Sequence, residues 1–277
     1  MQLEFSIDGI TVNVICEDNS VPLDKIPIVF LHGFTGCAND WLFLFDKLNP
    51  KFFPIAIDLP GHGKSIVPNN LEFFSAKSYT NIVSIVLNKL NIKKTILVGY
   101  SMGGRTALSF AVENSEKVLA LILESSTAGI ENQNEKTSRI KTDYQLADKI
   151  ISDGIDAFTE YWMNLAFFTS LKSLNDKDYS KIIESKKRNS PEGLSNSLKG
   201  FSTGKMPSLW NKLNSIRVPT LLIAGSLDSK YRRLNKEMNF VIPNSEIKII
   251  ENCGHNIHLE KPEEFTILVN EFLNKIK

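Results

Sequence analysis

The sequence predicts an α/β protein in which helices cover both faces of a mostly parallel central sheet and a helical lid is inserted into the chain. Three observations predict this class. Short runs rich in β-branched residues alternate with amphipathic stretches, which is typical of parallel strands connected by helices. Two of these runs, 95–99 and 119–123, are apolar almost throughout, as strands buried on both faces are. The alternation stops between residues 126 and 210 and then resumes.

Seven runs are expected to form the strands of the sheet. They lie at residues 10–16, 28–32, 53–58, 95–99, 118–124, 220–225 and 247–250. The last helix has the clearest pattern, because Pro262 suits a first helical turn and apolar side chains recur at helical spacing from Phe265 to Ile276. We expect this helix to complete the fold.

Residues 126–210 contain about three helical patterns and no convincing strand. We therefore expect them to form a lid between two parts of one core, residues 1–125 and 211–277. Basic and acidic residues nearly balance in this segment, so it is not a basic arm. Its aromatic side chains are expected to cover the carboxyl edge of the sheet, where ligands bind in open α/β folds.

Composition and charge argue against several classes of function. Lys+Arg 32 against Asp+Glu 31 gives a net charge of +1, so no overall field attracts nucleic acid or an anionic membrane. No apolar run reaches about 18 residues, and the first ten residues do not resemble a signal peptide, so we expect no membrane insertion. Three scattered cysteines, Cys16, Cys37 and Cys253, form no metal or redox motif and fit a reducing compartment. A cytoplasmic protein is expected.

Residues 99–103, Gly-Tyr-Ser-Met-Gly, follow an expected strand and open a helix expected at 102–113. This is the context of a nucleophile elbow, in which the flanking glycines permit a turn so sharp that the side chain of Ser101 is exposed. A serine before a helix is often only an N-cap. The strand on one side and the helix on the other favour a functional Ser101.

A serine hydroxyl needs a histidine to accept its proton, and that histidine needs a carboxylate to fix its tautomer. His255 lies in a loop after the last expected strand and fits the chain order serine, acid, histidine. His32 and His62 lie in glycine-containing turns, where hydrogen bonding within the turn or surface exposure explains them better. We therefore expect His255 to be the base.

Two acidic residues at strand ends, Asp228 and Glu124, compete for the third position. Both precede His255 in the chain. Asp228 is favoured because it lies in a loop containing Gly225, which allows its carboxylate to turn inward. An aspartate after a strand can also be a turn or cap residue, and Glu124 stays open as the rival.

Two backbone amides are expected to form an oxyanion hole. Phe34 follows the strand expected at 28–32, in the position from which this architecture donates one amide, and Met102 follows the serine. Each such donor contributes about 3 kcal/mol to the stability of a developing oxyanion.

More specific segments resemble the 2-succinyl-6-hydroxy-2,4-cyclohexadiene-1-carboxylate synthases of menaquinone biosynthesis, a family of the α/β-hydrolase superfamily. The matching segments are residues 99–105, 123–126, Arg139 with Asp143, 146–147, Trp162, 188–189 and 203–210. The resemblance covers nearly the whole chain and implies an α/β-hydrolase fold. It implies a lyase that eliminates pyruvate from 2-succinyl-5-enolpyruvyl-6-hydroxy-3-cyclohexene-1-carboxylate without a cofactor or metal. Its catalytic residues fall on Ser101, Asp228 and His255.

The resemblance also implies a set of substrate-binding residues, namely Tyr100, Arg105, Arg139, Trp162 and Arg188. The chemistry of a tricarboxylate substrate supports the arginines independently, since the chain has 26 lysines but only six arginines. Arg105 lies one helical turn after Ser101, on the same face. Arg139 and Arg188 lie in the expected lid, although a single lid arginine is also readily explained as a surface charge.

Two other functions are compatible with the same motifs. The first is a serine esterase or carbon–carbon bond hydrolase in which Ser101 attacks a carbonyl group. The second is a non-catalytic ligand-binding protein that keeps the fold, although such proteins usually have a damaged triad and this one does not. For the lyase we infer that Ser101, activated by His255, acts as a base rather than a nucleophile.

Overall fold

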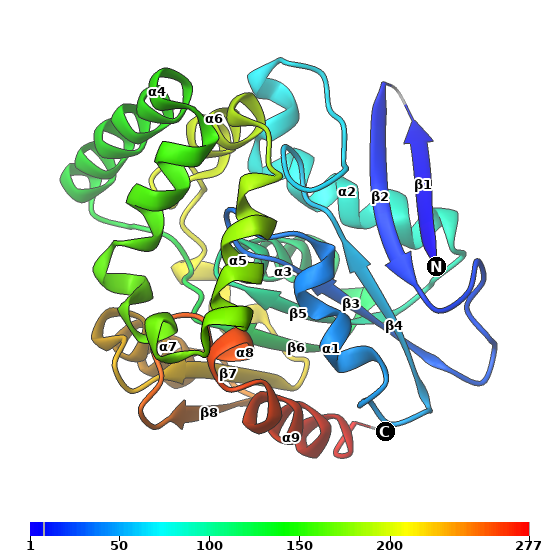
Figure 1. Cartoon of the computed structure of the whole chain (residues 1–277). Helices are drawn as coiled ribbons and strands as arrows, with labels where there is room; N and C mark the ends of the chain where they lie inside the picture. Colours follow the sequence, from blue (N-terminus) through cyan, green and yellow to red (C-terminus); the bar gives the residue numbers. More distant parts are fainter. Residues whose placement is uncertain (8, 277) are drawn as a thin grey trace.

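A computed structural model describes residues 1–7 and 9–276 and shows a sheet with helices on both faces (Figure 1). The strands within these ranges are β1 (Gln2–Ile7), β2 (Ile10–Cys16), β3 (Ile26–Leu31), β4 (Phe52–Ile57), β5 (Thr95–Tyr100), β6 (Val118–Glu124), β7 (Thr220–Gly225) and β8 (Ser245–Ile250). They are arranged in the order β1-β2-β4-β3-β5-β6-β7-β8. The pairs β1–β2 and β2–β4 are antiparallel, and all the other pairs are parallel. The predicted fold class is therefore confirmed.

All seven predicted strands are present, but the analysis of the sequence missed β1. This strand lies at one edge of the sheet and pairs only with β2. Its apolar residues Leu3, Phe5 and Ile7 alternate with polar ones, which is the pattern of a half-buried strand. The alternating pattern of an edge strand is therefore present in the sequence. The strand is too exposed to have the continuous apolar run of the central strands.

Helices follow most of the parallel strands in the chain. They are α1 (Leu42–Phe45), α2 (Ala76–Lys89), α3 (Met102–Glu113), α4 (Gln133–Met163), α5 (Asp176–Lys187), α6 (Pro191–Phe201), α7 (Ser229–Val241), α8 (Ile257–Glu260) and α9 (Pro262–Leu273). The last helix begins at Pro262 as predicted and ends three residues before Ile276. Among the described residues, no helix combines the length and the apolar character needed to cross a membrane.

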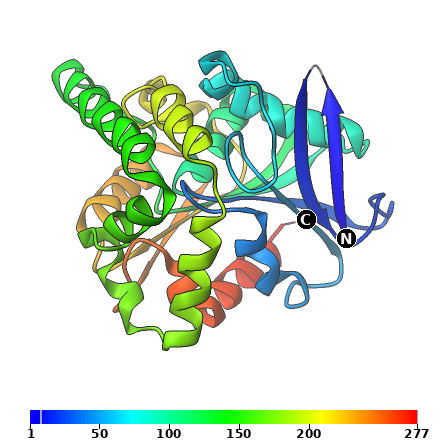
Figure 2. The same ribbon diagram turned by 45° about the horizontal axis from the view of Figure 1, so that its top comes forward.

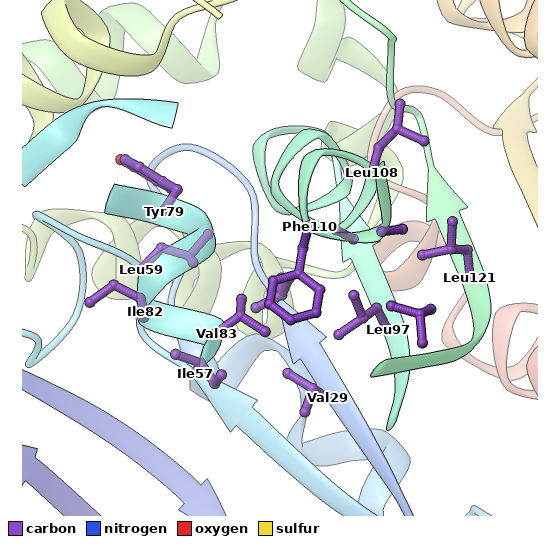
Figure 3. Packing of buried hydrophobic residues seen from close by; sticks show 14 of the residues in the cluster. Val29, Ile57, Leu59, Tyr79, Ile82, Val83, Leu97, Leu108, Phe110 and Leu121 are labelled. Atoms are coloured by element: carbon purple, nitrogen blue, oxygen red, sulfur yellow. The ribbon is translucent and has the colours of Figure 1, made fainter. Parts of the chain in front are cut away.

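Alternate side chains of the central strands enter two separate cores. Val29 and Leu97 point to the face covered by α2 and α3, where they lie close to Val83 and Phe110 (Figure 3). Their neighbours in the strands enter the opposite core, where Phe265 of α9 packs. Because successive side chains of a strand point to opposite faces, this burial on both sides explains the nearly continuous apolar runs.

In the sequence, helices α4, α5 and α6 come after β6 and before β7. Residues 126–210 contribute no strand to the described sheet. Helices α4 and α6 lie beside each other, away from α9, in both views (Figures 1 and 2). They share a small core of their own, in which Phe158 and Leu194 are buried. Helix α4 consists of two helical segments that meet at Gly154, where the φ angle is +78° and the backbone is not helical.

Candidate active site

Ser101 lies in the sharp turn between β5 and α3, with a φ angle of +49° that non-glycine residues rarely adopt. The flanking glycines make this turn possible. A Cβ atom at Gly99 would lie 2.4 Å from the carbonyl oxygen of Gly103, and one at Gly103 would lie 2.0 Å from the carbonyl oxygen of Leu31. The Ser101 N–H donates to the carbonyl of Glu124 at the end of β6, 2.8 Å away. This bond fixes the turn to the neighbouring strand.

The structure brings the three residues predicted for the triad together at the carboxyl ends of the parallel strands. His255 Nε2 lies 3.2 Å from Ser101 Oγ, and His255 Nδ1 lies 2.5 Å from Asp228 Oδ2. The other Asp228 oxygen accepts a hydrogen bond from the N–H of Tyr231 at 3.1 Å. A carboxylate held in this way orients the imidazole so that Nε2 can accept the serine proton.

Glu124, the rival acid, is paired with a different histidine. Its oxygens lie 3.0 and 2.8 Å from Nδ1 of His258 and one of them also accepts the backbone N–H of that residue at 3.0 Å. Both side chains are fully buried, and the His258 ring stacks on Trp41 with 4.3 Å between the ring centroids. The Glu124 carboxylate is therefore hydrogen-bonded to His258 and not to His255.

The backbone N–H groups of Phe34 and Met102 form no hydrogen bond with any other described residue, so both can donate to a ligand. The loop that contains Phe34 is held by hydrogen bonds from the end of α5 and from the turn that follows it. Lys186 Nζ donates to Thr35 Oγ1 at 3.1 Å, and Asn189 Nδ2 donates to the Thr35 carbonyl at 3.0 Å. Thr35 has a φ angle of +67°, so these bonds hold a conformation that is unfavourable for threonine.

His32 and His62 hold the loops beneath this site. His32 Nε2 accepts the N–H of Leu59 at 2.9 Å, and His62 Nδ1 lies 3.0 Å from the carbonyl of Pro60. Burial lowers the pKa of both imidazoles, so both are neutral at pH 7. The interpretation of these two residues as turn residues fits this geometry, although both are buried and neither is at the surface.

A cavity of about 90 Å³ lies against Ser101 and is lined by nearly all the predicted site residues. These are Phe34, Tyr100, Ser101, Met102, Arg105, Arg139, Trp162 and His255. Phe167 and Phe168, which also line the cavity, are among the aromatic side chains of residues 126–210 expected at the carboxyl edge of the sheet. The other lining residues were not predicted, and they are Ser197, Leu198, Phe201, Ser202, Thr203 and Tyr231. Within the described chain, this cavity has two arginines and no carboxylate in its lining.

Arg105 is a buried cation that lacks an anionic partner. Its side chain is stacked over the ring of Phe201, 4.8 Å from the ring centroid, and Nη1 donates to the Phe201 carbonyl at 2.6 Å. No carboxylate of the described residues forms an ion pair with it. Burial lowers the pKa of its guanidinium to about 10, which leaves it charged at pH 7. A buried charge of this kind is stabilised when an anion binds beside it.

Comparison with known proteins places this geometry in a family. Residues 26–262 match the family model of the alpha/beta hydrolase fold. A Bacillus subtilis (strain 168) protein, named provisionally as a 2-succinyl-6-hydroxy-2,4-cyclohexadiene-1-carboxylate synthase, is 41% identical over 249 residues, which is 90% of each chain. The synthase of that name from Citrobacter koseri is 30% identical and is covered to 88% by 85% of this chain.

The chain belongs to the 2-succinyl-6-hydroxy-2,4-cyclohexadiene-1-carboxylate synthase family of α/β hydrolases. A solved structure supports this assignment: MenH from S. aureus has a TM-score of 0.88 and 33% identity, with 95% of this chain and 98% of that chain covered. A thermophilic esterase from Thermogutta terrifontis has a TM-score of 0.86 but 23% identity, and its similarity shows the fold alone.

One substrate-binding residue carried over from the synthase family is not in the cavity. Arg188 is exposed at the end of α5, and the prediction that it lines the pocket disagrees with the structure. The residue of this turn that points inward is Lys186, which is buried and has a pKa lowered by burial. Because two residues correspond to about 200° of rotation along a helix, Arg188 faces the opposite side.

Arg139 also lines the cavity, but its guanidinium is already paired with a carboxylate of the protein. Its Nε atom lies 2.8 Å from both carboxylate oxygens of Asp143, one helical turn later in α4. The two terminal nitrogens of its guanidinium make no hydrogen bond with the described residues. Arg139 therefore differs from Arg105, since its charge is already balanced before a ligand binds.

In the described part of the chain, no group of three or more histidine, cysteine or acidic side chains is arranged to hold a metal ion.

Proposed function

We propose that the chain eliminates pyruvate from 2-succinyl-5-enolpyruvyl-6-hydroxy-3-cyclohexene-1-carboxylate and produces 2-succinyl-6-hydroxy-2,4-cyclohexadiene-1-carboxylate in menaquinone biosynthesis. The observation that carries this proposal is Arg105, a buried cation without an ion-pair partner, beside the same cavity as Ser101. An ester substrate without charge would leave this guanidinium uncompensated. A substrate with three carboxylates supplies the missing anion, as the relatives' names lead us to expect.

Ser101 acts as the base in the proposed mechanism. His255 Nε2 accepts the hydroxyl proton while the Ser101 oxygen removes the ring proton next to the succinyl ketone. The electron pair of that C–H bond moves through the ring double bond, and the C–O bond to the enolpyruvyl group breaks. The ring becomes a diene, and the departing enolate takes the extra proton from His255 to give pyruvate, which returns Ser101 and His255 to their starting protonation states. No bond between Ser101 and the substrate forms.

The backbone amides of Phe34 and Met102 stabilise the negative charge that develops on the ketone oxygen during this step. Asp228 holds the His255 ring and stabilises the imidazolium that forms when the proton arrives. Arg105 and Arg139 bind carboxylates, and Tyr100 and Trp162 complete the wall of the site. All the groups needed for the proton transfer come from the chain itself, so the proposed reaction uses no cofactor.

Residues 126–210 serve as a lid in this proposal, with residues 1–125 and 211–277 as the core. The cavity beside Ser101 is lined from both parts, by Ser101 and Arg105 of the core and by Arg139 and Trp162 of residues 126–210. We expect the lid to close over the bound substrate. Closure then removes water and strengthens the ion pairs with the arginines. We place this reaction in the cytoplasm, in keeping with the free cysteines.

The test is a coupled assay that measures pyruvate released from the enolpyruvyl cyclohexene substrate, run beside an assay with p-nitrophenyl acetate. We expect rapid pyruvate release, abolished by Ser101→Ala, and slow ester hydrolysis. Fast turnover of the ester without pyruvate release would replace the proposal with the esterase function. Failure of both reactions in folded protein would favour a ligand-binding role.

A further inference from the structure

Two hydroxyl groups in the wall of the cavity have no hydrogen-bond partner among the described residues. They are Ser202 Oγ and Thr203 Oγ1. Ser202 is 2% exposed and Thr203 is 7% exposed. Buried hydroxyls in folded proteins are nearly always paired, because an unpaired one loses its bonds to water and gains nothing in return. Two such groups in successive residues beside one cavity therefore need an explanation.

The backbone that carries these two hydroxyls is held in place by neighbouring segments. Ser202 ends helix α6, and its carbonyl accepts hydrogen bonds from the N–H groups of Lys205 and Met206 at 3.0 and 2.9 Å. Gly204 follows in close contact with α4, where an added Cβ would lie 2.9 Å from Cγ1 of Ile140. The fold therefore sets the backbone positions from which both hydroxyls extend into the wall of the cavity before any ligand enters.

The same segment holds the unpaired cation of the site. Arg105 donates one N–H to the carbonyl of Phe201, the residue directly before Ser202, and its guanidinium has further N–H groups to donate. A carboxylate has about four lone-pair positions, so one carboxylate can accept from the guanidinium and from two hydroxyls together. The absence of acidic side chains from the described lining leaves such an anion without a competitor.

We propose that Ser202 and Thr203 are substrate-binding residues whose hydroxyls donate to one carboxylate of the substrate, with Arg105 balancing its charge. This inference rests on the proposed function, because it assigns a carboxylate of the same substrate to these residues. Arg105 supplies charge, and the two hydroxyls supply direction. Together they select a planar anion at this end of the cavity over a neutral group of similar size.

The experiment compares two changes that remove a hydroxyl group, Ser202→Ala and Thr203→Val, with two matched controls, Ser109→Ala and Thr159→Val. The control hydroxyls are also buried and unpaired, with 4% and 1% exposure, but lie on α3 and α4 and do not line the cavity. In pyruvate-release kinetics we expect KM to rise about 10-fold or more in the first pair, as for loss of a hydrogen bond to a charged group, with kcat within about two-fold of wild type. The controls should keep the wild-type KM.

Stability measurements separate binding from folding. Removal of an unpaired buried hydroxyl should leave Tm unchanged or raise it in all four variants. Thr203→Ser keeps the hydroxyl and should restore KM close to the wild-type value. Wild-type KM in both Ser202→Ala and Thr203→Val would overturn the proposal and show that the two hydroxyls are satisfied by water alone.

A binding experiment keeps this inference separate from the reaction. Calorimetric titration with 2-succinylbenzoate, an aromatic analogue of the product, and with pyruvate measures the affinity of each half of the substrate without turnover. Weaker binding of either ligand to the Ser202 and Thr203 variants, but not to the controls, supports the carboxylate subsite even if wild-type protein releases no pyruvate. Equal affinities in all the variants would overturn the subsite even if pyruvate release is fast.

Discussion

Glu124 and His258 form a second carboxylate–histidine pair directly behind the triad, with 2.8 Å between a carboxylate oxygen and Nδ1. The ring of Tyr100 lies between this pair and the Asp228–His255 pair, 4.9 Å from the His258 centroid and 5.4 Å from that of His255. Of these two histidines, only His255 lines the cavity beside Ser101. The two acids that compete in the sequence therefore belong to two different histidines.

This pairing gives opposite predictions for the two acids. Asp228→Asn should lower kcat by about 10⁴-fold, because an amide stabilises the wrong tautomer of His255. Glu124→Gln should change kcat little but lower the free energy of unfolding by about 1–3 kcal/mol, since it weakens a buried hydrogen-bonded pair. Pyruvate-release kinetics and urea unfolding measure the two effects. The reverse ranking of the two kcat values would make Glu124 the functional acid.

The serine and the histidine should act as one unit. Ser101→Ala and His255→Ala should each remove most of the activity, by about 10³-fold or more, and the double variant should be little worse than either single one. Steady-state pyruvate release with the three purified variants checks this. Multiplying losses in the double variant would mean that the two residues act independently, and near-normal turnover by folded Ser101→Ala protein would contradict the mechanism.

The serine is a base in the proposed mechanism, so it should never carry the substrate. Mass spectrometry of enzyme quenched during turnover should show an unmodified chain, whereas a reactive phosphonate should still label Ser101. The phosphonate-labelled protein is the control that an adduct of this serine survives the measurement. Accumulation of a covalent adduct from the native substrate would favour the hydrolase mechanism.

The loss of kcat/KM on replacing each arginine should be largest where the guanidinium has no anionic partner in the protein. Arg105→Ala should lower kcat/KM by about 10- to 150-fold, because a buried carboxylate loses a charge-assisted hydrogen bond. Arg139→Ala should cost less, since Asp143 already pairs with this side chain. Arg188→Ala should stay close to wild type. At position 105, lysine should give an intermediate value, because it keeps the charge but loses the planar fork.

The same kinetics contain the control for this ranking. Arg233 is exposed and pairs with Glu237 on the surface of α7, so Arg233→Ala should have no effect beyond a small change at low salt. An Arg105→Ala variant that behaves like Arg233→Ala would show that no carboxylate binds there.

Phe167 should control access of water to the site. Its ring is 42% exposed and lies between the small cavity and a neighbouring one of about 380 Å³, and both cavities are lined by Phe167 and His255. Phe167→Ala should join them, lower the rate of pyruvate release and raise hydrolysis of p-nitrophenyl acetate several-fold. Tyr161→Ala is the control, since Tyr161 is 43% exposed but lines neither cavity. Equal ester hydrolysis in the two variants would exclude a gating role.

The parts of the site that could be predicted are those fixed by local sequence. The elbow at Ser101 depends on a strand, two glycines and a helix that are neighbours in the chain, and the order of Asp228 and His255 follows from the order of the strands. Arg188 could not be placed in this way. Its position depends on which face of α5 packs inward, and Lys186 with its bond to Thr35 occupies that face.

The burial of Ser202 and Thr203 also could not be predicted from the local sequence. Nothing in a Ser-Thr pair after an amphipathic helix distinguishes a buried, unpaired hydroxyl from an exposed one. Their burial results from contacts between α6, α3 and α4, segments that are separated by about 20 residues or more in the chain. Such contacts carry no local periodic pattern, so only the assembled structure reveals them.

The break in α4 at Gly154 makes the shape of the proposed lid depend on the lengths of the two helical segments that meet there. Arg139 and Trp162 are on opposite sides of this glycine, and a straight helix would separate them by about 35 Å, yet both line one small cavity. One extra residue between Arg139 and Gly154 would rotate the guanidinium by about 100° about its own helical segment and leave Trp162 in place. Relatives with insertions or deletions on one side of this glycine would then differ in substrate preference while keeping the same catalytic residues.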